Sequence, residues 1–138
     1  MIDKVLIACD GSRQSERAYD FGLDMVVKYG AQVIVLSVAR PPEPPVNVEL
    51  QAVLENAREH YQELFGRLRA KAATFNVEPQ FEVMVGHPAE QIVHFANEQD
   101  VDVIVMGHRG ESLLQRWLLG SVAKRVLSYA HCTVVVVR

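Results

Sequence analysis

The chain has 138 residues, of which 49% are apolar and 22% are charged, and this length and composition predict a single compact domain over residues 1–138. A chain of this size buries roughly 68% of the surface that it exposes when unfolded, which suffices for a core without metals or disulfides. Its 14 basic and 17 acidic residues give a formal net charge of −3, which argues against nucleic acid as a partner, because nucleic-acid-binding domains usually carry a basic patch.

The short apolar runs and the N-terminal residues indicate where the protein is located in the cell. Runs such as 33–36 and 134–137 are far shorter than the ~20 residues of a membrane span, so we expect no integral membrane role. Residues 1–5 lead into a strand-like run without a basic, apolar leader, which favours the cytoplasm. Cys9 and Cys132 border apolar runs, where a free thiol acting as a small hydrophobe is favoured over a redox role.

The first half of the chain alternates strand and helix patterns. Residues 5–9 form an apolar run that Asp10-Gly11-Ser12 closes, as in a buried parallel strand followed by a turn. Residues 14–29 have helical spacing, with Gly30 as the terminator. Their apolar positions are Ala18, Phe21, Met25, Val26 and Tyr29. Residues 33–38 are again continuously apolar apart from one serine. The proline-rich run 41–45 favours a stiff exposed loop over an SH3-type ligand.

The second half continues the alternation. A long apolar stripe predicts a helix over residues 48–76, and the mixed pattern of 81–85 predicts an edge strand that Gly86-His87-Pro88 closes. Three further elements are expected: a short helix over 89–99, a strand over 101–106 and a helix from Ser121. The last strand covers 133–137 and is expected at an edge of the sheet.

The strict alternation of strands and helices predicts right-handed crossovers and a five-stranded parallel sheet with helices on both faces. This is a three-layer α/β/α fold. Sheets of this kind bind ligands beyond the carboxyl ends of their strands, where the strand order reverses. Functional residues are therefore expected after Cys9, Val38, Val85 and Met106.

Glycines after the fourth strand have the spacing G-x2-G-x9-G-S. Gly107 and Gly110 permit positive φ and a close approach of backbone N–H groups, and Gly120-Ser121 opens a helix whose unpaired N–H groups favour an anion. Charge from Arg109, and from His108 when protonated, adds to this phosphate cradle. The alternative is that each glycine serves only a strand end, a turn or a helix start.

Other nucleotide and enzyme signatures are absent. The sequence has neither a G-x4-G-K-S/T loop nor a G-x-G-x-x-G turn after the first strand. No nucleophile is paired in sequence with a base, so an enzyme is not evident. Histidines 60, 87, 94 and 131 lack metal-ligand spacing, and no metal site is expected.

These segments together resemble the universal stress protein family over the whole chain, and in particular its nucleotide-binding branch. The resemblance rests on Val5-Leu6-Ile7-Ala8-Cys9-Asp10-Gly11-Ser12, on Gly86-His87-Pro88-Ala89, and on Val105-Met106-Gly107-His108-Arg109-Gly110 through Leu119-Gly120-Ser121-Val122. It implies the adenine nucleotide alpha hydrolase-like fold and a binding site for ATP, with Mg²⁺ and with AMP or ADP as alternatives.

The resemblance also implies roles for single residues. Adenine would lie near Ala8, Asp10 and the main chain of Val38, with Met106 on the ribose side. The phosphates would lie against Gly107, Gly110, Gly120, Ser121 and the amide of Val122, while His108 and Arg109 occupy variable positions of the motif. Ala8 stands where the family often has proline or valine, and Thr133 replaces a common proline. For Asp10, ligand contact is favoured over capping of the following helix.

The resemblance implies a cytoplasmic, nucleotide-dependent sensor or regulator of the stress response that acts on an unknown protein partner. A homodimer through the C-terminal strand is expected, because an exposed apolar edge strand otherwise invites aggregation. The rival hypotheses are a slow ATPase or adenylyl-transferring enzyme of the same superfamily, and a dimeric scaffold without ligand.

Overall fold

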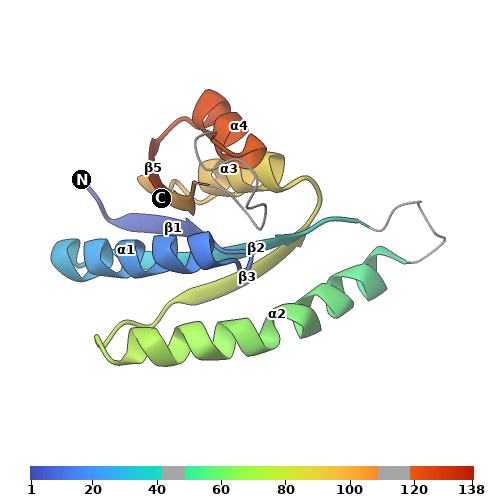
Figure 1. Cartoon of the computed structure of the whole chain (residues 1–138), viewed down its shortest axis with the longest axis horizontal. Helices are drawn as coiled ribbons and strands as arrows, with labels where there is room; N and C mark the ends of the chain where they lie inside the picture. Colours follow the sequence, from blue (N-terminus) through green and yellow to red (C-terminus); the bar gives the residue numbers. More distant parts are fainter. Residues whose placement is uncertain (42–48, 109–118) are drawn as a thin grey trace.

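The computed structural model describes residues 1–41, 49–108 and 119–138, which form one twisted parallel sheet between two layers of helices (Figure 1). In chain order the elements are β1 (Lys4–Ala8), α1 (Arg13–Tyr29), β2 (Gln32–Ala39), α2 (Leu50–Ala73), β3 (Gln80–Val85), α3 (Pro88–Glu98), β4 (Val103–Gly107), α4 (Ser121–Tyr129) and β5 (Thr133–Val137). The strand order is β3-β2-β1-β4-β5, and every pairing is parallel. The predicted five-stranded α/β/α architecture is confirmed.

The central strands are buried on both faces, as their apolar runs predict. Val5, Leu6 and Ile7 of β1 have no exposed surface. Val5 and Ile7 pack in the core under α1 and α2, whereas Leu6 packs in the core under α3 and α4. Successive side chains of a strand point to opposite faces, so one continuous apolar run supplies both cores.

Local signals fix the helix ends. Ser12 is the N-cap of α1, and its Oγ accepts from the Ser15 N–H at 3.2 Å. Gly30 ends α1 with a left-handed φ of 64°. Pro88 lies in the first turn of α3, as predicted. Gly86 before it has φ +153°, a backbone conformation that favours glycine, whereas the atoms nearest to an added Cβ belong to the flexible Gln91 side chain.

Some sequence expectations are wrong in detail. The buried stripe of α1 runs through Tyr19 and Leu23, while Phe21 and Tyr29 are about half exposed. The spacing of apolar residues alone does not show that Tyr19 is the buried aromatic residue. Tyr19 is buried because its hydroxyl has a partner in the core, the Leu68 carbonyl, to which it donates at 2.6 Å. Helix α2 is shorter than the predicted 48–76 at its C-terminal end, and Phe75 beyond it is exposed.

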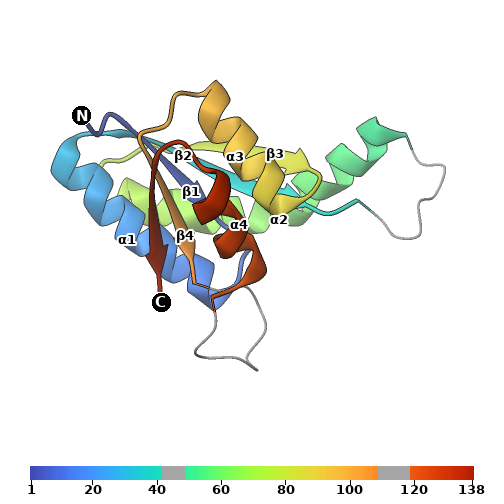
Figure 2. The same ribbon diagram turned by 90° about the horizontal axis from the view of Figure 1, so that it is seen from above.

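The two edge strands are β3 and β5, as expected from the sequence. Strand order reverses between β1 and β4, because the chain first proceeds from β1 to β2 and β3 and then crosses back to β4 and β5. Figure 2 shows β1, β4 and β5 running toward the same end of the molecule. The carboxyl ends of β1, β2 and β4 therefore meet at one edge, where parallel sheets bind ligands.

Within the part of the chain that the structure describes, no helix combines the length and apolarity needed to cross a membrane.

Candidate functional site

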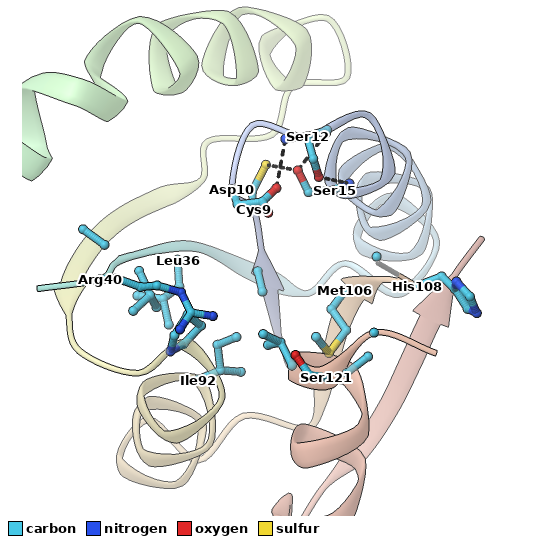
Figure 3. A pocket seen from close by; sticks show the side chains of 18 of the residues that line it. Cys9, Asp10, Ser12, Ser15, Leu36, Arg40, Ile92, Met106, His108 and Ser121 are labelled. Carbon is cyan, nitrogen blue, oxygen red and sulfur yellow. Dashed lines mark hydrogen bonds between the residues drawn. The ribbon is translucent and has the colours of Figure 1, made fainter. Parts of the chain in front are cut away.

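A cavity of about 890 Å³ opens at the carboxyl edge of the sheet (Figure 3). Its walls come from the ends of β1, β2 and β4, from α2 and α3, and from the first turns of α1 and α4. Nine of the eleven site residues expected from the sequence line this one cavity: Ala8, Asp10, Val38, Met106, Gly107, His108, Gly120, Ser121 and Val122. The other two, Arg109 and Gly110, lie outside the described residues.

A hydrogen-bond network fixes the wall that follows β1. The Ser12 N–H donates to Asp10 Oδ1 at 2.9 Å, and the Ser15 hydroxyl donates to the Ser12 carbonyl at 2.9 Å. Cys9 Sγ lies 3.3 Å from Ser15 Oγ, and burial raises the pKa of this thiol. Ser12 rather than Asp10 caps α1, so the alternative role for Asp10 as the cap is wrong. The exposed Asp10 carboxylate is held at the rim of the cavity by the turn.

The end of β2 offers backbone groups to the cavity. Leu36 is the last residue of β2 in register with β1, and its carbonyl accepts from the Cys9 N–H at 3.0 Å. Because backbone groups of alternate residues in a strand point to the same side, the N–H and C=O groups of Val38 lie on the β1 side of β2, beyond the end of β1. The Val38 carbonyl already accepts from the Tyr61 hydroxyl at 3.5 Å. Ser37 Oγ donates to the Cys9 carbonyl at 2.6 Å and holds the two strand ends together.

The start of α4 is fastened to the ends of β4 and β5 through one residue. The His108 N–H donates to the Val137 carbonyl at 2.7 Å, and the His108 carbonyl accepts from the Gly120 N–H at 3.0 Å. The Gly120 N–H is therefore occupied within the protein. In Figure 3 the His108 ring points away from Met106 and Ser121, so His108 contributes to the cavity mainly through its backbone.

The first turn of α4 supplies anion-binding groups. Gly120 is the N-cap in extended conformation, and as a glycine it has no side chain with which to cap the helix. The N–H groups of Ser121, Val122 and Ala123 have no intrahelical acceptor, because an α-helix leaves its first N–H groups without partners. These groups and the Ser121 hydroxyl border the cavity, so its α4 wall suits a phosphate or another anion.

Gly107 has a different role from the expected one. Its φ is not positive, since the described glycines with positive φ are Gly11, Gly30 and Gly86. A Cβ at Gly107 would lie 2.9 Å from the Gln14 carbonyl carbon and 3.0 Å from the Gln14 carbonyl oxygen. Glycine is needed here because the first turn of α1 packs against the end of β4.

Sequence reasoning missed several residues of the cavity. Arg40 follows β2, and in Figure 3 its side chain extends over the cavity toward Ile92 of α3. Lys124 of α4 and His60 of α2 also line it. Asp10 is the sole carboxylate among the described lining residues, so the charged side chains of the wall are mainly basic although the chain is net negative. A basic residue directly after a strand end was an available signal for Arg40 only.

The described residues contain no cluster of three or more His, Cys, Asp or Glu side chains that could hold a metal ion. The cavity instead combines an apolar part, formed by residues such as Leu36, Ile92 and Met106, with an anion-binding wall at α4. A ligand with a flat apolar group at one end and a phosphate at the other fits this arrangement.

Comparisons with known proteins agree with this architecture. A family model described as the universal stress protein family matches residues 1–138. A universal stress protein of Methanocaldococcus jannaschii is 35% identical, with 98% of this chain and 81% of that protein covered. One from Methanothermobacter thermautotrophicus is also 35% identical, with coverage of 100% and 97%.

Solved structures share the fold. The universal stress protein UspA of Lactobacillus plantarum superposes with a TM-score of 0.86 at 22% identity, covering 99% of this chain and 98% of that one. A universal stress protein in complex with cAMP has a TM-score of 0.77 at 24% identity, with coverage of 99% and 97%. A third, from Archaeoglobus fulgidus in complex with dAMP, has a TM-score of 0.72 at 22% identity and covers both chains fully.

Proposed function

Since this chain belongs to the universal stress protein family, we propose that it binds an adenine nucleotide, ATP with Mg²⁺, in the cavity at the carboxyl edge of its sheet. The observation that carries the proposal is the placement of an uncapped helix start, with Ser121, opposite an apolar wall within one cavity of about 890 Å³. Two proteins of the same fold are complexes with cAMP and dAMP, which supports an adenine nucleotide as the ligand class.

We propose a place for each part of the nucleotide along the cavity walls. In this proposal adenine lies near Ala8, Asp10 and the N–H and C=O groups of Val38, and Met106 lies on the ribose side. An adenine edge offers an acceptor next to a donor, so it is complementary to a backbone pair of this kind. The phosphates lie at the first turn of α4, where the Ser121 hydroxyl and three helix N–H groups donate to them.

In this proposal Mg²⁺ is bound mainly by the phosphates of the nucleotide and not by a set of protein ligands. Mg²⁺ favours oxygen ligands and commonly keeps several waters while it binds one or two carboxylates and the substrate phosphates. Asp10 is the only carboxylate among the described residues of the wall, and its Oδ1 already accepts from Ser12. The chain thus fits a Mg²⁺ that arrives on the triphosphate.

The proposed role is regulatory. A nucleotide bound between α4 and the ends of β1 and β2 contacts segments that are otherwise joined through the sheet. Its binding therefore alters a surface to which a cytoplasmic protein partner binds. The second copy of the chain in a homodimer would pair with β5, an edge strand whose valines are partly buried. A light-scattering mass of a monomer at micromolar concentration would remove the dimer from this proposal.

Isothermal titration with Mg-ATP tests the ligand. We expect saturable binding, and no heat up to millimolar ATP with folded protein would overturn the proposal. The variant Ser121→Ala should weaken binding by about 10-fold or more, because it removes one hydrogen bond to a charged group. Ser128→Ala is the matched control, since Ser128 lies on the same helix and its Oγ donates to the Lys124 carbonyl outside the cavity wall. Phosphate release by the same protein over hours separates binding from hydrolysis.

A further inference from the structure

We propose that Lys124 is a specificity residue that contacts the phosphates beyond the first, so that the cavity prefers ATP over AMP. This inference rests on the proposed nucleotide site and adds a residue and a ligand preference to it. Neither the glycine motif nor the strand ends point to Lys124; its place in the cavity wall does.

The position of Lys124 on α4 brings its ammonium group to the phosphate end. Lys124 is the fourth residue of the helix, and its N–H donates to the carbonyl of the cap residue Gly120 at 3.0 Å. Residues three or four apart are neighbours on a helix surface, so Lys124 and Arg125 both lie near Ser121, and of these two cations only Lys124 lines the cavity. Helical side chains tilt toward the N-terminus, which directs the long lysine stem back along the cavity wall toward the N–H groups of the first turn.

The charge of Lys124 conflicts with the preference of its own helix. A cation near a helix N-terminus is unfavourable, because the first turn already carries partial positive charge. Helices α1 and α3 have Glu16 and Glu90 in their first turns, whereas α2 has no acid there. Helix α4 has no acid there, and Lys124 borders the same turn. Local violations of this kind are expected where a ligand supplies the compensating charge.

An anion at this wall meets two different kinds of donor. The N–H groups of the first turn point along the helix axis, and together with the Ser121 hydroxyl they suit a single phosphate group. Lys124 extends from the side of the helix, so its ammonium is offset from that axis and suits a neighbouring phosphate. A monophosphate contacts only the helix N–H groups and Ser121, whereas a triphosphate also contacts Lys124. Lys124 therefore favours nucleotides with more than one phosphate.

The test compares Lys124→Ala with Arg125→Ala by titration against AMP, ADP and ATP at fixed ionic strength. Arg125 is the matched control, because it is an exposed cation of the same helix turn that does not line the cavity. We expect Lys124→Ala to weaken ATP binding about tenfold, the low end for a bond between charged groups because Lys124 is solvent-exposed, and to leave AMP within about twofold. Arg125→Ala should leave both nucleotides within about twofold of the wild type.

Each other outcome has a definite meaning. Equal losses for AMP and ATP in Lys124→Ala, or equal losses in the two variants, would overturn the inference while leaving the nucleotide site in place. Failure of the wild type to bind all three nucleotides would overturn the proposed function and the inference with it. Misfolding does not confuse the result, because loss of a cation near the start of α4 should leave the thermal midpoint unchanged or slightly raise it.

Discussion

Replacing Gly107 by alanine tests whether this motif glycine serves packing rather than phosphate approach. The added Cβ would lie 2.9 Å from the Gln14 carbonyl carbon and 3.1 Å from its Cβ. Both atoms belong to the first turn of α1, where the Ser12 cap fixes the backbone. Relief therefore requires a shift of α1 away from the end of β4, because no flexible side-chain end is available to move.

The expected cost follows from two opposed effects. Overpacking of this kind costs about 1–3 kcal/mol, and the smaller entropy of an unfolded chain with alanine offsets about 0.4–1 kcal/mol. With mid-range values of about 2 and 0.7 kcal/mol for the two effects, the net destabilisation is about 1.3 kcal/mol, which lowers the thermal midpoint by roughly 4–6 °C for a chain of this length. Any loss of nucleotide affinity would then accompany a loss of stability, since α1 carries Ser12 and Ser15 of the cavity wall.

Urea unfolding followed by circular dichroism measures this cost. Gly66→Ala is the control: Gly66 lies exposed within α2, and a Cβ there meets nothing within 4 Å. That variant should gain about 0.5–1 kcal/mol, because alanine is the better helix former. If Gly107→Ala were as stable as the wild type yet failed to bind nucleotide, the packing explanation would be refuted and the glycine assigned to ligand approach.

Three further variants test single bonds. Tyr19→Phe should cost about 1 kcal/mol in urea unfolding, because the buried hydroxyl donates to the Leu68 carbonyl at 2.6 Å; an unchanged midpoint would contradict this. Ser12→Ala should cost about 1 kcal/mol through loss of the α1 cap to the Ser15 N–H, and a change under a few tenths would refute it. For Asp102, two backbone N–H donors near the start of β1 lower the carboxyl pKa. Its charged form then stabilises the fold above pH about 4 and loses that effect as the pH falls through the lowered folded-state pKa. The stability difference between wild type and Asp102→Asn should shrink from pH 7 to pH 3, and a constant difference would show that ionisation is irrelevant.

The sequence predicted most of the fold because its signals are local. Continuous apolar runs such as 33–38 specify strands buried on both faces, and Ser12, Gly30 and Pro88 mark helix ends through their own side chains or backbone preferences. The alternation of strands and helices then allowed few topologies. The errors arose where spacing was ambiguous: Phe21 and Tyr19 both fit an apolar stripe on α1, and only the packing of Tyr19 against α2 decided between them.

Some residues of the candidate site could likewise be predicted from the sequence, and others could not. The sequence by itself predicted that the strand ends and the start of the last helix would come together, because parallel strands place their carboxyl ends at one edge. Only the tertiary structure decided that Arg40, His60 and Lys124 share the cavity with Ser121, since these residues come from separate elements and carry no motif. It also decided that Gly107 faces α1. Contacts between distant segments depend on how helices pack across the sheet, and residue spacing along the chain does not contain that information.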